Sequence, residues 1–293
     1  MTHLFTGVAA AVTTPFTNEE VDYNSFRRHL EFLIENNIQA LVINGTTGEG
    51  STLTAEESSR LLEIAVETAA GRVPVIAGTG SNSTAESIRA SREAKEIGAD
   101  GLMLITPYYN KTSQRGLIRH FEAIVNAAEL PALLYNVPSR TGMTIAPETV
   151  LELSRHPYIV GLKDATGDLN YMSQVRLVTD PSFALYSGND DTALPFTSLG
   201  GQGVISVVAN VVPAQFQEMY EQTFTNLTRA QELHYRLTPL ISALSVDVNP
   251  IPIKVLTSHL GFGDYEVRLP LVPLEEEEQS RLIRQFESMM MEV

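Results

Sequence analysis

Ile159-Val160-Gly161-Leu162-Lys163 is an apolar run of strand length that ends in a lysine and leads into the turn-like segment Asp164-Ala165-Thr166-Gly167. Seven similar apolar runs occur along the first three-quarters of the chain. Together the eight runs cover residues 8–12, 40–43, 73–77, 101–105, 132–135, 159–163, 183–186 and 203–207. Between them, apolar residues recur at i, i+3, i+4 and i+7, as in Phe26, Leu30, Leu33 and Ile34, which is typical of amphipathic helices.

Alternating strands and helices indicate a parallel sheet, and eight such units predict a closed (β/α)8 TIM barrel of the α/β class. An open, doubly wound sheet is the alternative. After about residue 210 only helical patterns remain, at residues 213–224, 229–244, 252–260 and 274–291. We therefore expect a barrel over residues 1–225 and a C-terminal helical domain over residues 226–293. The acidic run at 275–278 fits the first turn of the last helix, where negative charge complements the helix dipole.

The composition excludes several classes of function. The chain has 293 residues and a net charge of −15, which argues against nucleic acid as a partner. It has no cysteine, so disulfides, thiol nucleophiles and thiolate metal sites are excluded. No apolar run approaches the roughly 18 residues of a membrane span, and the N-terminus is a poor signal peptide. We expect a cytoplasmic protein without a membrane partner.

Lys163 is the residue that points most directly to chemistry. The other three lysines have ordinary surface interpretations: Lys95, Lys111 and Lys254. Strand alternation puts Ile159, Gly161 and Lys163 on one face, and Gly161 leaves room beneath the lysine if that face is the barrel interior. Desolvation lowers the pKa of a buried lysine, and the neutral amine forms Schiff bases with ketones and aldehydes. A surface lysine at a strand end is the alternative.

Other unusual residues follow the predicted strands, at the end of the barrel where catalytic groups lie. The turn Gly45-Thr46-Thr47-Gly48-Glu49 offers hydroxyls and backbone N–H groups that can hold a carboxylate or phosphate. Tyr135 is either a proton relay or a packing residue. Arg140 is either a bidentate carboxylate ligand or an exposed arginine.

A metal site is not expected. The six histidines show no i, i+4 pair and no nearby carboxylates at metal-ligand spacing. Asp190-Asp191 follows the seventh predicted strand and is interpreted as a helix N-cap in preference to a ligand pair.

Five motifs, in this order, resemble those of the dihydrodipicolinate synthase family. They are Gly45-Thr46-Thr47-Gly48-Glu49, Pro107-Tyr108-Tyr109-Asn110, Tyr135-Asn136-Val137-Pro138-Ser139-Arg140-Thr141-Gly142, Gly161-Leu162-Lys163-Asp164-Ala165-Thr166-Gly167 and Gly203-Val204-Ile205-Ser206. Asn249-Pro250-Ile251-Pro252-Ile253-Lys254 also resembles the C-terminal helical region of that family. The resemblance covers nearly the whole chain. It implies a class I aldolase-type barrel that condenses pyruvate with L-aspartate 4-semialdehyde through a lysine Schiff base, in the diaminopimelate route to lysine.

The resemblance also implies residue roles. Lys163 forms the imine with pyruvate, and Tyr135, Thr46 and Tyr109 form a proton relay. Tyr109 comes from a neighbouring subunit, so a homo-oligomer, either a dimer or a tetramer, is implied. The implied substrate-binding residues are Thr47, which with Thr46 contacts the pyruvate carboxylate, Arg140, which binds the semialdehyde carboxylate, Ile205, whose carbonyl lies beside the lysine, and Gly188. No cofactor is implied.

The sequence leaves two other functions open. N-acetylneuraminate lyase and the keto-deoxy sugar acid aldolases share the lysine and the tyrosine. The Gly-Thr-Thr-Gly-Glu turn, where sialic acid enzymes tend to have Gly-Ser-Thr-Gly-Glu, and Arg140 favour the synthase. A non-catalytic binding barrel is the second alternative, and the retained lysine, tyrosines and arginine oppose it.

Feedback inhibition by lysine is not expected. Inhibited relatives bind lysine in a dimer-interface cleft near the first helix after Glu49, where some carry histidines. The matching positions here are Ala55 and Ser58, and Gly50 stands where a serine is common. Three other positions still match that cleft: Asn82, Glu86 and Tyr108. The substitutions predict insensitivity to lysine.

Overall fold

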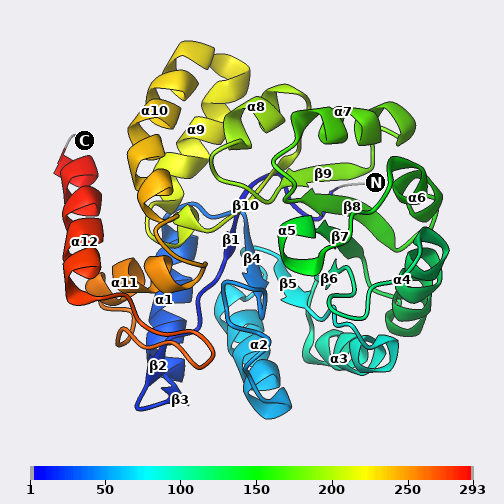
Figure 1. The fold of residues 1–293 in the computed structure, drawn as a ribbon, viewed down its shortest axis with the longest axis horizontal. Coiled ribbons are helices and arrows are strands. Elements are labelled where there is room, and N and C mark those ends of the chain that lie inside the picture. The colour runs from blue at the N-terminus through cyan, green and yellow to red at the C-terminus, as the bar shows by residue number, and fades with distance from the viewer. Residues whose placement is uncertain (1–2, 292–293) are drawn as a thin grey trace.

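The computed structural model describes residues 3–291, and its centre is a closed barrel of eight parallel strands (Figure 1). The strands are β1 (Gly7–Ala11), β4 (Ala40–Ile43), β5 (Val75–Gly78), β6 (Gly101–Ile105), β7 (Ala132–Asn136), β8 (Ile159–Asp164), β9 (Ala184–Ser187) and β10 (Gly203–Ser206). Each strand pairs with the next one, and β10 closes the barrel by pairing with β1. The predicted (β/α)8 barrel is confirmed, and no strand end differs from its prediction by more than two residues.

Helices follow the strands and surround the barrel (Figure 1). They are α1 (Tyr23–Glu35), α2 (Ala55–Ala69), α3 (Thr84–Ile97), α4 (Gln114–Ala128), α5 (Pro138–Thr141), α6 (Pro147–Leu153), α7 (Leu169–Val178), α8 (Ala193–Ser198), the 3₁₀ turn η1 (Val208–Asn210) and α9 (Pro213–Thr225). A small hairpin of β2 (Phe16–Thr17) and β3 (Glu20–Val21) was not predicted, because two-residue strands carry no periodic pattern.

Three further helices follow α9 and lie on the left of Figure 1: α10 (Leu227–Ala243), α11 (Ile251–His259) and α12 (Glu276–Met291). α10 packs on α9, and α12 packs on α10 and α11. The expected C-terminal helices and the acidic first turn of α12 are confirmed. The division into domains at residue 225 stays a prediction. Within residues 3–291, no helix combines the length and apolar character that a bilayer crossing requires.

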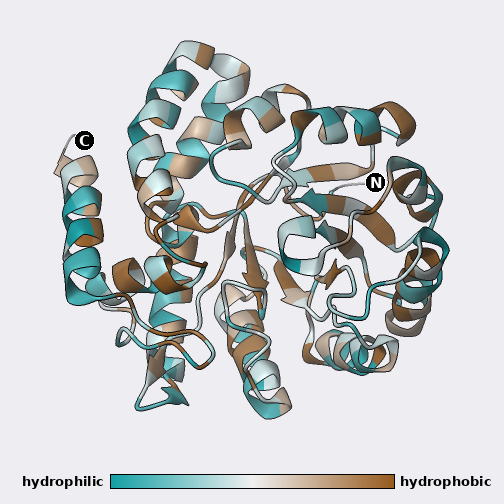
Figure 2. Cartoon of the chain, in the orientation of Figure 1, coloured by the Kyte–Doolittle hydropathy of each residue, from teal (hydrophilic) through white to brown (hydrophobic). Residues whose placement is uncertain are grey.

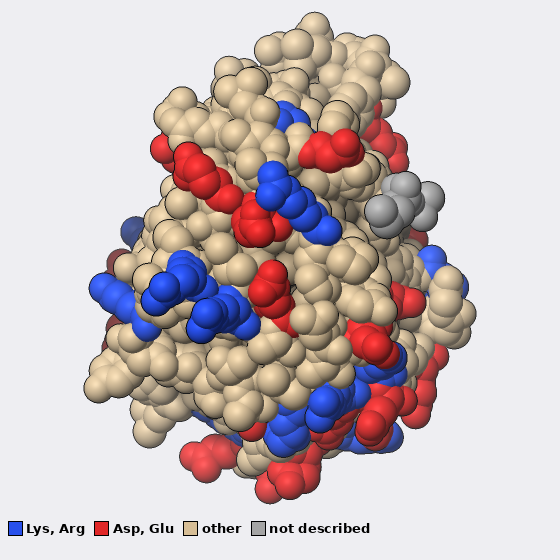
Figure 3. Space-filling model, turned by 90° about the vertical axis from the view of Figure 1, so that its right-hand side faces the viewer, with Lys and Arg blue, Asp and Glu red and all other residues tan. Residues whose placement is uncertain are grey.

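Two apolar clusters form the core. The larger one lies between the strands and the surrounding helices, and the smaller one fills the barrel with residues such as Ala9, Val42 and Leu133. Figure 2 accordingly shows strongly hydrophobic strands at the centre and mixed, amphipathic helices around them. On the face shown in Figure 3, several basic side chains gather at the left, and elsewhere acidic and basic side chains are interspersed.

The sixth strand of the barrel, β8, departs from the expected alternation. The β7–β8 register shifts by one residue, so that Ala132 pairs with Ile159 whereas Leu133 pairs with Gly161. Ile159 therefore packs in the outer cluster, and the expectation that it shares a face with Lys163 is wrong. Gly161 does face the interior, because a Cβ there would lie 2.9 Å from Leu133 Cδ2 inside the barrel.

Candidate active site

Lys163 lines a cavity of about 480 Å³ at the C-terminal ends of the barrel strands. Its walls come from the turns after β4, β7, β8 and β9 and from the segment that joins α10 to α11. Six of the eight residues singled out from the sequence line it: Thr46, Thr47, Tyr135, Arg140, Lys163 and Gly188. Ile205 and Tyr109 are not among the lining residues.

The Lys163 side chain is well suited to nucleophilic chemistry. Lys163 is only 5% exposed, and its Nζ lies 4.3 Å from the centre of the Tyr135 ring. Burial lowers the pKa of Lys163 to about 8, the Arg140 charge acts in the same direction, and the Asp190 carboxylate opposes both. A substantial fraction of the amine is therefore neutral near physiological pH. The alternative of a surface lysine is wrong.

Tyr135 lies next to Lys163 across the β7–β8 pairing and is also buried. Burial raises the pKa of Tyr135, whereas the Arg140 charge and a hydrogen bond with the Thr46 side chain oppose that rise. The phenol is thus protonated at neutral pH and lies between the amine and a hydroxyl. Such a group can give a proton to a leaving oxygen and recover it from the next step.

The turn that follows β4 is shaped by its glycines. A Cβ at Gly48 would lie 2.9 Å from the backbone oxygen of Val12, so a side chain does not fit there. The hydroxyl of Thr14 donates to the Gly48 carbonyl at 2.7 Å, which fixes the turn to the segment that follows β1. After the turn, α2 begins with a capping box in which Thr54 and Glu57 bond each other's backbone N–H groups.

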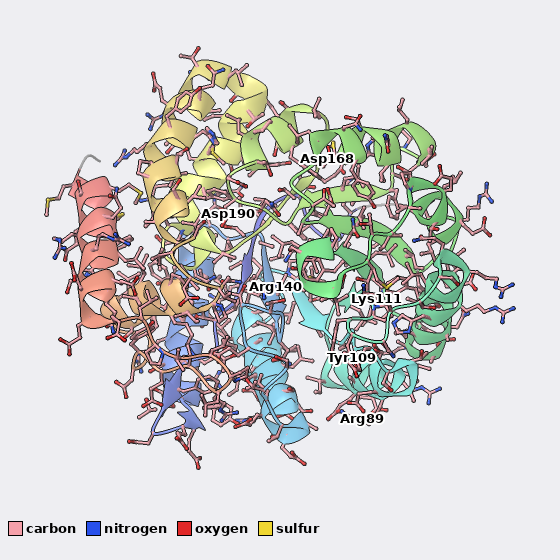
Figure 4. All side chains as sticks on the ribbon, viewed as in Figure 1. Arg89, Tyr109, Lys111, Arg140, Asp168 and Asp190 are labelled. Atoms are coloured by element: carbon pink, nitrogen blue, oxygen red, sulfur yellow. The ribbon has the colours of Figure 1, made fainter. Side chains whose placement is uncertain are left out.

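Asn249, in the segment before α11, joins two of the predicted substrate-binding residues. Its Nδ2 donates to Thr47 Oγ1 at 3.0 Å, and its backbone oxygen accepts from Arg140 Nη2 at 3.1 Å. Arg140 is exposed, lies at the end of α5 and lines the cavity (Figure 4). Asn249 was not predicted as a site residue, because it lies 202 positions from Thr47 in the sequence.

Asp190 also lines the cavity, and its expected role as a helix N-cap is wrong. The N-cap of α8 is Thr192, whereas Asp190 Oδ2 accepts from the backbone N–H groups of Val207 at 3.0 Å and Val208 at 2.8 Å. Asp190 thereby joins the β9 turn to the end of β10. Burial raises the pKa of Asp190. Among residues 3–291, no group of three or more histidine, cysteine or acidic side chains has the arrangement of a metal site.

Gly188 and Ile205 have different relations to the lysine. A Cβ at Gly188 would lie 2.7 Å from Ala165 Cβ and 3.1 Å from Lys163 Cε, so only glycine leaves room for the lysine stem. Ile205 is fully buried in the smaller apolar cluster inside the barrel, and it pairs with Ala9 of β1. The structure therefore brings Gly188 to the site and places the Ile205 side chain in the barrel core.

Tyr109 is remote from the cavity of its own chain. It is 92% exposed, has a φ of 67° and lies toward the rim of the barrel near α3 (Figure 4). A large aromatic side chain with this exposure packs against little of its own chain. Tyr108, its neighbour, is partly covered and lines a second cavity.

The second cavity, of about 360 Å³, lies between α2 and α3 and shares Thr46 and Tyr135 with the first. Its lining includes five of the six positions compared above with lysine-inhibited relatives, namely Gly50, Ala55, Ser58, Glu86 and Tyr108, whereas Asn82 is not among the lining residues. Arg89 also lines it and pairs with Glu86 at 2.7 Å and with Glu93 at 2.7 Å. Both carboxylates of this cavity thus already face a guanidinium group.

Known proteins resemble this chain over nearly its whole length. Residues 4–289 match the family described as the dihydrodipicolinate synthetase family. A 4-hydroxy-tetrahydrodipicolinate synthase of Macrococcus caseolyticus is 58% identical over 282 residues, which cover 96% of this chain and 95% of the relative. A protein of the same name from Staphylococcus epidermidis is 58% identical over 288 residues, 98% of both chains. A solved structure described as the first monomeric dihydrodipicolinate synthase variant has a TM-score of 0.95 at 38% identity, covering 98% of this chain and 97% of that one.

Proposed function

The chain belongs to the dihydrodipicolinate synthetase family, and we propose that it condenses pyruvate with L-aspartate 4-semialdehyde to form 4-hydroxy-tetrahydrodipicolinate. The observation that carries this proposal is the buried amine of Lys163, with its lowered pKa, beside the Tyr135 phenol. Relatives that share 58% of its residues over nearly the full chain favour this activity over a sugar acid aldolase or a non-catalytic barrel. A cytoplasmic location, as for other biosynthetic enzymes, is part of the proposal.

The first half of the reaction joins pyruvate to the enzyme. The neutral Lys163 Nζ attacks the keto carbon, and the Tyr135 phenol protonates the oxygen that leaves as water, which yields an iminium ion. Thr46 and Thr47 hold the pyruvate carboxylate through hydroxyl and backbone N–H donors. The iminium ion withdraws electrons from the methyl carbon, so loss of a proton there gives an enamine.

The second half forms the carbon–carbon bond. The enamine carbon attacks the aldehyde carbon of the semialdehyde, whose carboxylate is bound by the Arg140 guanidinium. The substrate amine then adds to the iminium carbon and displaces Lys163, which closes the ring and frees the enzyme. One water is released for each product formed, and the relay through Tyr135 and Thr46 returns each proton to its starting place.

The substrate assignment is tested by comparing aldehydes. With pyruvate as the donor, we expect kcat/KM for L-aspartate 4-semialdehyde to exceed that for N-acetylmannosamine and glyceraldehyde by roughly 100-fold or more, since Arg140 pairs with a carboxylate that the sugars lack. An assay that follows pyruvate consumption measures all three on one scale. A preference for either sugar aldehyde would assign the chain to a sister aldolase.

We further propose that Tyr109 completes the relay in a neighbouring subunit, so that the active form is a homo-oligomer. The support is its 92% exposure together with its absence from the cavity of its own chain. We expect Tyr109→Phe and Lys163→Met to be nearly inactive separately and to regain activity when mixed. In a mixed dimer, the subunit that keeps Lys163 receives an intact Tyr109 from the Lys163→Met partner.

The mixing experiment has a clear negative outcome. The two variants are unfolded together, refolded together and assayed. The control sample contains the same two variants, each refolded alone before they are combined. If Tyr109 acted within its own chain, a mixed dimer would contain no complete site and activity would stay at the level of the single variants. Sedimentation of the mixture shows whether mixed oligomers form.

Lysine is not expected to inhibit this chain. The second cavity presents small side chains at Ala55 and Ser58, and Arg89 already pairs with both Glu86 and Glu93, so an added ammonium group would have to compete with that guanidinium for their carboxylates. We expect the initial rate at subsaturating pyruvate to stay constant as L-lysine is raised into the millimolar range. Half-inhibition below one millimolar, roughly −4 kcal/mol of binding, would contradict this expectation.

A further inference from the structure

A buried ion pair links the turn at residues 45–50 to the C-terminal helical region. Lys254 Nζ, on α11, lies 2.5 Å from Glu49 Oε1, and the two side chains are only 2% and 1% exposed. The interpretation of Lys254 as a surface lysine is therefore wrong. Residues 251–257 of α11 are all buried, which carries Lys254 into the interface with the barrel.

Both oxygens of Glu49 are occupied. Oε2 accepts from the backbone N–H of Arg268 at 3.0 Å, and the Lys254 ammonium also lies 4.0 Å from the centre of the Phe16 ring. Replacing a buried ion pair by apolar residues is often neutral or stabilising, because desolvating two charges offsets their attraction. Stability alone is thus a weak reason for such a pair, whereas it does fix the geometry of whatever it joins.

The pair joins α11 to the residues that hold pyruvate. Glu49 has a φ of 54°, a left-handed conformation that is uncommon for residues other than glycine, and its N–H donates to the Thr46 carbonyl at 3.1 Å. Thr47, between them, is bonded by the side chain of Asn249, which precedes α11. The turn is therefore anchored twice to the C-terminal region, at Thr47 and at Glu49.

We propose that Glu49 and Lys254 are positioning residues that hold Thr46 and Thr47 in place for the pyruvate carboxylate. Through them the C-terminal helical region sets the affinity of the barrel for pyruvate. This inference rests on the proposed function, in which Thr46 and Thr47 bind that carboxylate. Neither Glu49 nor Lys254 lines the cavity that contains Lys163, so both act through the turn.

Three variants separate positioning from stability: Glu49→Gln, Lys254→Met and the double variant. Each single change leaves one buried charge without its partner, so both should unfold at lower denaturant concentration than wild type. The double variant has neither charge and should recover much of that stability. The double variant still lacks the link to the turn, so Thr46 and Thr47 are misplaced. We therefore expect the half-saturating pyruvate concentration of the double variant to stay raised by roughly tenfold.

The readout is borohydride trapping of the enzyme at a series of pyruvate concentrations, together with KM for each substrate. Arg236→Met is the matched control, because it also removes a cation of the C-terminal region, one whose Nη2 donates to the Met289 carbonyl. We expect this control to leave the pyruvate dependence unchanged. In the double variant, KM for pyruvate should rise more than KM for the semialdehyde.

Two results would overturn the inference. In the first, pyruvate affinity returns to the wild-type value in the double variant as stability returns, which makes the pair purely structural. In the second, the control raises KM for pyruvate as much as the double variant does. Failure of the proposed function is distinguishable in two ways. A chain without Schiff-base chemistry would show no trapping of the wild type with pyruvate, and a sister aldolase would still be trapped but would prefer a sugar aldehyde.

Discussion

We expect Lys163→Met to lower kcat by about 10⁴-fold or more, because it removes the amine that we propose forms the covalent intermediate. Methionine is close in length to lysine and follows the same channel past Gly188, so the cavity keeps its shape. Steady-state kinetics with pyruvate and the semialdehyde measure the loss. Activity within tenfold of wild type would show that another group initiates the reaction.

The stability of Lys163→Met shows whether its loss of activity comes from a disturbed fold. The pKa of Lys163 falls from 10.5 to about 8 on folding because the buried amine is desolvated. The unfolded chain therefore binds more protons than the folded one between these values, and the penalty for burying the amine is largest below pH 8. At pH 7, Lys163→Met should be more stable than wild type by up to about 3 kcal/mol.

This gain in stability depends on pH in a defined direction. As pH rises through 8 toward 10.5, the folded wild type already has a neutral amine and the unfolded chain loses its proton, so the difference between the proteins shrinks. Denaturant titrations at pH 7 and pH 10 measure it. A variant that is inactive and also less stable at pH 7 would indicate a disturbed fold.

We expect Tyr135→Phe to lower kcat by roughly 10²- to 10³-fold, since it removes the phenol of the proposed proton relay and leaves the ring beside Lys163 in place. Lys163 is retained, so the imine with pyruvate should still form, but more slowly. Single-turnover trapping with borohydride separates slow imine formation from failure to bind pyruvate.

Tyr186→Phe is the matched control for this prediction. Tyr186 pairs with Lys163 on the other side, across β8 and β9, and is equally buried. Its hydroxyl donates to the Phe5 carbonyl at 2.7 Å in the barrel core, away from the cavity. We expect it to lose about 1 kcal/mol of stability and little activity. Equal losses of kcat in both variants would contradict the relay.

The fold was predictable because each barrel strand is an apolar run bounded by helical periodicity. The irregular step in β8 was not, since alternation assumes regular pairing, and the register shift at Ala132 depends on the neighbouring strand. The burial of Lys254 was missed for a similar reason. Its partner, Glu49, lies 205 positions away, and α11 alone gives no sign of that contact.

The site was predictable where the barrel itself supplies the geometry. Strand ends of a closed barrel meet at one rim, so Thr46, Tyr135 and Lys163 had to converge once the strands were recognised. The contacts that Asn249 and Asp190 make depend on the course of irregular segments over that rim. No periodic pattern describes such segments, and only the folded chain places them.

The Schiff base at Lys163 is tested most directly by reduction of the wild-type enzyme with borohydride in the presence of pyruvate, followed by intact mass and peptide mapping. Because Lys163 and Lys254 are both buried with pKa values lowered to about 8, mapping is needed to tell them apart. We predict one pyruvate-derived adduct per chain, on the peptide that contains Lys163. The absence of an adduct, or an adduct on Lys254, would contradict the Schiff-base mechanism at this site.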